Sequence, residues 1–195
     1  MRLPFPYKIT LALTYRCNLR CKICRIWEYP SKDELAIESI EIFFKNLNHL
    51  SWIDLTGGEI TLREEIVEII KVIIKNSKRI LILHISTNGQ LPERVFLLAK
   101  EILRFNLIPI INISIDGPPV INDQLRGVQG AYLNSLETFK KLNLIKLIGD
   151  VLQPSKFVVV CEAEGPTPIY EGPFDFELFK KEVLPLMEWE KYGYR

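Results

Sequence analysis

Residues 8–25 read KITLALTYRCNLRCKICR, a largely apolar, β-prone run that leads directly into clustered cysteines. Three of the four cysteines of the chain, Cys17, Cys21 and Cys24, stand in the spacing C-x3-C-x2-C. A thiol is a weak ligand until it loses its proton, and converging thiolates repel one another unless a cation holds them. The loop therefore predicts a metal or cluster site. Three ligands leave one position open, as in catalytic rather than structural centres.

A pair of disulfides is an alternative for the four cysteines, but a bridge between Cys21 and Cys24 would close a very short loop. The first residues show no signal-like apolar stretch, because Pro4, Pro6 and Lys8 interrupt it. We therefore expect a cytoplasmic protein. In that compartment clustered cysteines are more often metal ligands or redox groups than structural disulfides.

Length and composition indicate one domain, or one domain with a short appendage. The chain has 195 residues, of which 48% are apolar, and a formal net charge of +1. Lys and Arg are spread along the chain, so no basic patch favours nucleic acid or an anionic membrane surface. No apolar run is long enough to span a bilayer. We expect neither nucleic acid nor a membrane as a partner.

Strands and helices are predicted to alternate along the chain. Apolar, β-rich segments predict strands at residues 8–15, 51–56, 80–86 and 108–115. The segments between them have the apolar spacing of amphipathic helices. We expect capping boxes at Ser31–Glu34 and Thr61–Glu64 to open the first two helices. The third is expected to run from Pro92 to about Phe105, and the fourth over residues 131–142 after a polar loop with Arg126-Gly127.

This alternation predicts an α/β fold with a parallel sheet and right-handed crossovers. In such folds the strand-to-helix loops share the carboxyl edge of the sheet, where ligands bind. We therefore expect four segments to face one mouth: the cysteine loop, Gly57-Gly58-Glu59, Thr87-Asn88-Gly89 and Ser114–Gly117.

The pattern is weaker after about Leu144. Residues 157–161 predict a fifth strand, residues 162–173 a Gly- and Pro-rich loop, and residues 176–189 a helix interrupted by Pro185. We divide the chain into a core over residues 1–165 and a C-terminal loop and helix over residues 166–195, which complete or cap the core.

Four motifs on successive strand ends, in this order, are similar to those of the radical S-adenosylmethionine (SAM) enzymes. They are the C-x3-C-x2-C loop, Thr56-Gly57-Gly58-Glu59, Ser86-Thr87-Asn88-Gly89 and Ser114-Ile115-Asp116-Gly117. The resemblance covers roughly residues 8–143. It is greatest to the branch that contains the molybdenum-cofactor GTP cyclase and the peptide-modifying SPASM enzymes.

The resemblance implies a partial (β/α) barrel that holds a 4Fe–4S cluster and SAM. Cys17, Cys21 and Cys24 would each bind one iron, and SAM would chelate the fourth. Reductive cleavage of SAM would give a 5′-deoxyadenosyl radical that abstracts hydrogen from a substrate. A full core of this family has six strand–helix units, so the resemblance also implies a barrel that is shortened or divergent at the C-terminus.

Further residues acquire roles from the same resemblance. Gly57 and Gly58 would let the backbone approach the methionine part of SAM, and Glu59 would accept from its ammonium group. Thr87 and Ser114 match positions that contact the methionine and ribose parts. Asn88 and Asp116 are further candidates, Arg126 is a candidate partner of the SAM carboxylate, and the backbone of Ile23 would lie near the adenine. The implied partners are a peptide or small-molecule substrate and an electron donor such as a ferredoxin or flavodoxin.

Two alternatives remain open at this stage. The first is a module that binds a cluster or SAM without catalysis, or a subunit of a larger assembly. The second is a zinc site that His49 or His84 completes, although we expect both histidines to be structural. Cys161 lies in an apolar segment and is expected to be a buried small hydrophobic residue.

Overall fold

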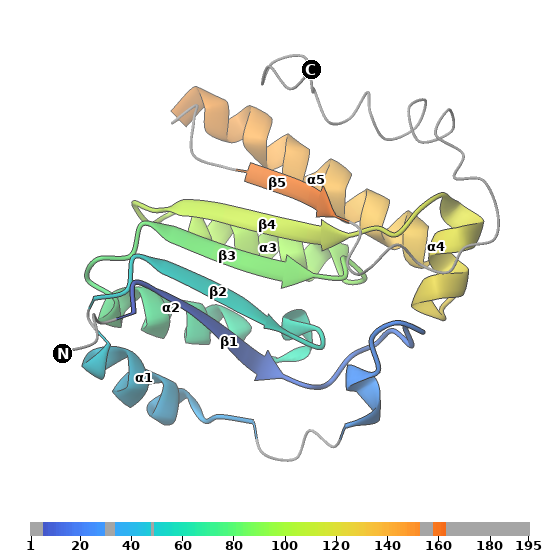
Figure 1. Cartoon of the computed structure of the whole chain (residues 1–195). Coiled ribbons are helices and arrows are strands. Elements are labelled where there is room, and N and C mark those ends of the chain that lie inside the picture. The colour runs from blue at the N-terminus through green and yellow to red at the C-terminus, as the bar shows by residue number, and fades with distance from the viewer. Residues whose placement is uncertain (1–5, 30–33, 48, 153–157, 163–195) are drawn as a thin grey trace.

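Five parallel strands form a single sheet in a computed structural model of the chain (Figure 1). The structure describes residues 6–29, 34–47, 49–152 and 158–162, and only the backbone beyond residue 144. Strands adjacent in sequence are adjacent in the sheet, which has the order β1-β2-β3-β4-β5. Their bounds are β1 Lys8–Thr14, β2 Trp52–Gly57, β3 Ile82–Thr87, β4 Ile108–Ser114 and β5 Val158–Glu162. The predicted parallel α/β architecture is confirmed, including the fifth strand.

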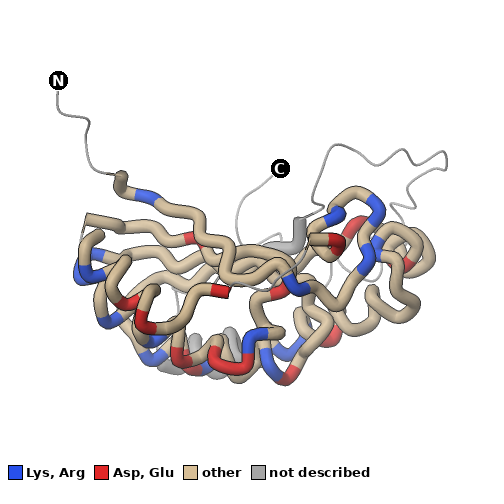
Figure 2. Tube along the Cα trace, turned by 90° about the horizontal axis from the view of Figure 1, so that it is seen from below, with Lys and Arg blue, Asp and Glu red and all other residues tan. Residues whose placement is uncertain are grey.

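Helices cover one face of this sheet, behind the strands in Figure 1. The longer ones are α1 Ile37–Asn46, α2 Ile66–Asn76, α3 Pro92–Ile102 and α5 Ala131–Leu152. Alternate strand residues such as Ile53, Leu55 and Leu83 pack against the apolar stripes of α1, α2 and α3. A second cluster joins β4 to α3 and α5 through Ile111 and Ile113. Lys, Arg, Asp and Glu are interspersed along the helical layer (Figure 2).

The opposite face of the sheet carries polar residues in its middle strands. Asp54 on β2 accepts hydrogen bonds from Thr10 and Trp52 and pairs with Lys8 at 2.9 Å. His84 on β3 lies beside it, with Nδ1 at 3.4 Å from a carboxylate oxygen of Asp54. Central strands of a parallel sheet covered on both faces are usually apolar throughout. The charged Asp54 therefore indicates that the sheet face opposite the helices is not a closed apolar core.

Both predicted capping boxes are wrong. Ser31 lies outside the described residues, and α1 begins only at Ile37, so Glu34 precedes the helix. Thr61 lies in a short 3-10 helix, η2 Ile60–Leu62, and α2 begins at Ile66. In both cases the carboxylate expected to cap a helix lies outside it, and Glu34 binds the cysteine loop, as described below.

Other helix boundaries also differ from the prediction. The expected polar loop before Gly127 contains helix α4 Pro119–Arg126, which starts at a proline and ends at left-handed Gly127. The fourth predicted helix is α5, which extends to Leu152 rather than ending at residue 142. A further short 3-10 helix, η1 Ile26–Glu28, follows the cysteines. The helix expected at residues 176–189 and the proposed C-terminal unit, 166–195, lie outside the described residues.

Among the described helices, none is both long enough and apolar enough to cross a bilayer.

Removal of Ile70 tests the packing of α2 on the sheet. Ile70 is 1% exposed, so Ile70→Ala leaves a cavity, and we expect a loss of about 2–5 kcal/mol of unfolding free energy. Ile42 on α1 is 62% exposed, so Ile42→Ala should stay within about 0.5 kcal/mol of the parent. Urea unfolding of the two variants measures the difference. Equal losses would show that α2 does not form the core described here.

Candidate functional site

Backbone hydrogen bonds hold the cysteine loop on both sides. On one side, Gly58 N donates to Thr14 O and Glu59 N to Arg16 O, each at 2.8 Å. On the other side, Arg20 N donates to Arg126 O and Lys22 N to Leu125 O, each at 2.9 Å. The loop between β1 and η1 is therefore fixed by main-chain contacts with the end of β2 and the end of α4.

Glycines make both contacts possible. A Cβ built on Gly58 would lie 2.2 Å from Arg16 O, and one on Gly57 would lie 2.2 Å from Thr14 O. A Cβ built on Gly127 would lie 2.4 Å from Arg20 O. Such distances are far inside van der Waals contact, so only glycine allows this approach. In this structure the space freed at Gly57 and Gly58 is filled by the cysteine-loop backbone.

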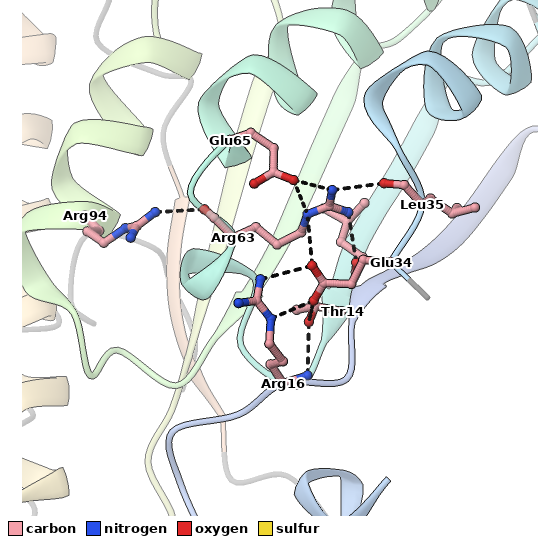
Figure 3. A network of polar contacts seen from close by, with 8 residues as sticks. Thr14, Arg16, Glu34, Leu35, Arg63, Glu65 and Arg94 are labelled. Carbon is pink, nitrogen blue, oxygen red and sulfur yellow. Dashed lines mark hydrogen bonds and ion pairs between the residues drawn. The ribbon is translucent and has the colours of Figure 1, made fainter. Parts of the chain in front are cut away.

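Thr14, Arg16 and Glu34 join the two ends of this loop by side-chain contacts, and we call these three residues the clasp (Figure 3). Arg16 donates to both carboxylate oxygens of Glu34, at 2.8 and 3.0 Å, and the Thr14 hydroxyl also donates to Glu34. Residues 14 and 34 lie on the two sides of the three cysteines in sequence. A bidentate guanidinium–carboxylate pair has a defined geometry, so the clasp fixes the two ends of the loop relative to each other.

Arg63 connects the clasp to the core. Its guanidinium, 2% exposed, donates to Leu13 O at 3.2 Å and Leu35 O at 2.9 Å, and pairs with Glu65 (Figure 3). Its Nε lies 3.8 Å from the Glu34 carboxylate. A buried charge is tolerated when acceptors of this kind surround it. The loop after β2 therefore supports the loop after β1 through one side chain.

The three cysteines line one pocket at the carboxyl edge of the sheet. Lining residues from the strand ends are Thr56, Gly57, Gly58, Ser86, Thr87, Asn88 and Ser114. Leu19, Ile26 and Trp27 contribute from the cysteine loop and η1, and Arg126 from α4. The predicted convergence of these loops is confirmed. Thr56 and Ser86 stand in the quoted motifs, but sequence reasoning gave them no role, although hydroxyls at the ends of predicted strands were a usable signal.

Two of the three sulfurs have side-chain donors. Asn88 Nδ2 lies 3.7 Å from Cys17 Sγ, and Arg126 Nη1 lies 3.9 Å from Cys21 Sγ. Burial raises the pKa of both thiols, and the Asn88 amide at Cys17 and the Arg126 guanidinium at Cys21 favour the thiolate and offset only part of that rise. Cys24 is exposed. The pocket thus combines thiols with the N–H and cationic groups that stabilise a thiolate.

Arg126 is nearly buried in this pocket. Its Nε lies 2.6 Å from Asp116 Oδ2, and the two side chains are 7% and 3% exposed. Nη2 has no hydrogen-bond partner among the described residues. A buried guanidinium with unused donor capacity is suited to an anionic group. Asp116 orients Arg126 and is not itself part of the pocket lining.

Glu59 is fully buried. Its carboxylate accepts from Thr61 N and Oγ1, from Thr87 Oγ1 at 2.9 Å and from Asn88 N at 2.6 Å. Burial raises the pKa of this carboxyl group, and the four donors lower it in part. Glu59 therefore joins the ends of β2 and β3 and does not line the pocket. To accept from a bound ammonium, as predicted, it would have to leave these donors.

Of the remaining candidate residues, Thr87 and Ser114 line the pocket and Ile23 does not. Thr87 and Ser114 line the pocket, as the sequence predicted, with their side chains nearly buried. Ile23 is 45% exposed and is not among the lining residues, so its predicted place near an adenine ring stays a prediction.

The donor set fits a 4Fe–4S cluster better than zinc. In the part of the chain that the structure describes, no three His, Cys, Asp or Glu side chains are arranged to hold a single metal ion. His49 precedes β2 and His84 lies within β3 beside Asp54, both away from the carboxyl edge. Neither can complete a site with the cysteines. Three thiols at one pocket, each free to take its own iron, fit the cluster instead.

Comparison with protein families agrees with this geometry. The family model described as the radical SAM superfamily matches residues 11–152. The antilisterial bacteriocin subtilosin biosynthesis protein AlbA of Bacillus subtilis is 32% identical over 72% of this chain and 31% of its own length. A probable GTP 3′,8-cyclase of Thermococcus kodakarensis is 33% identical over 94% of this chain and 64% of its own length. The chain therefore spans between about one third and two thirds of these curated relatives.

Solved structures show the same fold. The structure titled native anSMEcpe with bound AdoMet and Cp18Cys peptide has a TM-score of 0.55 and 20% identity, over 80% of this chain and 43% of that one. A histidine-tagged form of anSMEcpe with bound AdoMet has a TM-score of 0.58 and 16% identity, over 92% of this chain and 58% of that one. The predicted partial-barrel class is confirmed at the level of fold.

Substitution of Gly58 tests the backbone contact. Gly58→Ala places a methyl group against Arg16 O and must displace the cysteine loop, so we expect most of the bound iron and sulfide to be lost after anaerobic reconstitution. Gly130→Ala is the matched control. It has φ +82 but open space around its Cβ, and should cost on the order of 1 kcal/mol in stability while retaining iron. Full iron loading in Gly58→Ala would contradict the role of this contact.

The clasp predicts a specific acid dependence of stability. Arg16 and Thr14, outweighing burial, lower the folded-state pKa of Glu34 below its ordinary 4.5. The clasp is therefore fully stabilising above pH 4.5 and weakens as the pH falls through the lowered value. In urea unfolding of the cluster-free protein, Glu34→Gln should be less stable than the parent at neutral pH and should depend less on acid.

Glu41→Gln is the control for this experiment. Glu41 pairs with Lys45 on the surface of α1, and its pKa is also lowered, chiefly by that contact. An exposed pair of this kind contributes little to stability, so its removal should change the urea midpoint less at every pH. Identical profiles for the two variants would mean that the clasp is no more than a surface ion pair.

Proposed function

The chain belongs to the radical SAM superfamily, and we propose that it binds a 4Fe–4S cluster through Cys17, Cys21 and Cys24 and SAM beside it. When bound, the two groups supply reductive cleavage of SAM to methionine and a 5′-deoxyadenosyl radical, which abstracts hydrogen from a substrate. The observation that carries the proposal is the convergence at one pocket of three thiols and two sulfur-directed donors, Asn88 and Arg126.

Different pocket residues would contact different parts of SAM. Arg126, with Nη2 unpartnered among the described residues, is our candidate for the SAM carboxylate. The hydroxyls of Thr87 and Ser114, and the backbone at Gly57 and Gly58, line the same space and would contact the rest of the cofactor. Leu19, Ile26 and Trp27 add apolar surface, which excludes water from the reacting groups.

A peptide is the substrate class that we favour, and a small cofactor precursor is the second. Relatives of this chain include a protein named for bacteriocin biosynthesis and one named as a sporulation killing factor maturation protein, and one solved neighbour holds a peptide. Another relative is named as a GTP cyclase.

An electron donor such as a ferredoxin or flavodoxin would supply the reducing electron. We place this activity in the cytoplasm, without a nucleic acid or membrane partner.

A second candidate function is a non-catalytic cluster- or SAM-binding module, or a subunit of a larger assembly. The observation that favours it is the coverage of relatives, since the chain spans only 31% of AlbA and 33% of the sporulation killing factor protein. This alternative predicts a stable cluster and bound SAM without cleavage.

Anaerobic reconstitution with iron and sulfide, then dithionite and SAM, distinguishes these functions. We expect a brown protein with a 4Fe–4S spectrum that releases 5′-deoxyadenosine. Cys21→Ala should lose both the cluster and the product, since only two ligands remain. Cys161→Ala, outside the motif, should keep both. A cluster that never cleaves SAM would favour the binding module, whereas no cluster would overturn both proposals.

A further inference from the structure

The hydrogen bonds to the cysteine sulfurs are unequal. Cys17 Sγ has the Asn88 amide at 3.7 Å, and Cys21 Sγ has the Arg126 guanidinium at 3.9 Å. No side-chain donor to Cys24 is found among the described residues. The two donors come from different elements, the loop after β3 and the end of α4, and approach the cysteine loop from separate directions.

The Asn88 amide is held in a donating orientation. Its Oδ1 accepts from Gln90 N at 3.0 Å, so the Nδ2 end is the one that faces the cysteine loop. Nδ2 also donates to Asn18 Oδ1 at 2.7 Å. The Asn88 backbone is fixed too, since its N–H donates to Glu59 and its carbonyl accepts from Ser135 at 2.9 Å. The buried carboxylate of Glu59 thus helps to place a donor on Cys17.

Arg126 is held in a similar way. Asp116 Oδ2 lies 2.6 Å from Nε, and the backbone N–H of Asp116 donates to Asn122 Oδ1 at 3.0 Å. Arg126 is also the last residue of α4, where its carbonyl accepts from Arg20 N. Its Nη1 is therefore directed at Cys21 by contacts on both its side chain and its backbone.

From these contacts we propose that Asn88 and Arg126 set the reduction potential of the cluster by hydrogen bonding to its cysteine ligands. This inference rests on the proposed function, since it requires the cluster. Reduction adds negative charge to a cluster, and part of that charge lies on the ligand sulfurs. N–H donors stabilise this charge, so they raise the potential and make the one-electron reduction easier. Asn88 acts as a neutral donor, whereas Arg126 is a cationic donor whose removal would also leave the nearly buried carboxylate of Asp116 unpaired.

The test is the midpoint potential of the reconstituted cluster, followed by electron paramagnetic resonance during a redox titration. We expect Asn88→Ala and Arg126→Gln to shift it to more negative values, with the larger shift in Arg126→Gln. Arg126→Lys keeps the charge but loses the fork that reaches both Asp116 and Cys21, so its potential should fall between Arg126→Gln and the parent.

Two controls separate sulfur donation from general effects. Arg104→Gln removes one positive charge from a side chain that is 72% exposed and pairs with Glu101. Asn46→Ala removes an amide at the exposed end of α1. Both should leave the midpoint potential unchanged. If Arg126→Lys matches the parent, charge alone sets the potential and hydrogen bonding by Arg126 is overturned.

A second measurement needs no destabilising change in the parent protein. In reduced protein labelled with ¹⁵N only in the guanidinium groups of arginine, pulsed electron paramagnetic resonance should detect a nitrogen coupled to the cluster, and Arg126→Lys should remove that coupling, whereas Arg20→Lys, which changes another guanidinium at the loop, should retain it. Absence of that coupling in the parent would overturn the role of Arg126. Unchanged potentials in loaded Asn88→Ala and Arg126→Gln would overturn the whole inference while leaving the proposed function intact. Failure of the parent to assemble a cluster would instead refute the proposed function.

Discussion

The site depends on one constraint: the cysteine loop packs closely against two glycines, one at the end of a strand and one at the end of a helix. Gly58, directly after β2, meets the Arg16 carbonyl, and Gly127, directly after α4, meets the Arg20 carbonyl, with no room for a Cβ at either place. Cys17 lies between these two contacts, and Cys21 lies between the two backbone hydrogen bonds at Arg20 and Lys22. Their positions are therefore set by main-chain geometry, and the fold and the ligand set cannot be separated.

Charged side chains reinforce this arrangement from inside the protein. Arg63 and Glu59 are both almost completely buried, and each is satisfied by donors or acceptors from neighbouring loops. Arg63 supports the base of the cysteine loop, while Glu59 ties the end of β2 to that of β3. Because removal of one partner leaves a buried charge uncompensated, these contacts make the carboxyl edge behave as a unit.

Much of this was predictable from sequence. The strands were placed within two residues, because apolar, β-branched runs and parallel pairing are local signals, and the three cysteines identified the site directly. The capping boxes failed because Glu34 binds Arg16, a tertiary contact, and Thr61 donates to Glu59, a local contact two residues away. Helix α4 was missed since its polar sequence resembles a loop. The buried position of Glu59 and the clasp depend on residues far apart in sequence, which no local pattern reveals.

The main-chain anchoring of the cysteine loop has a consequence for its evolution. Lys22 and Ile23 are exposed, and the contact at residue 22 uses only its backbone N–H. Mutations at such positions can alter the outer surface of the loop without moving the thiols. The outer surface of the loop and the positions of the thiols are therefore separately adjustable in evolution.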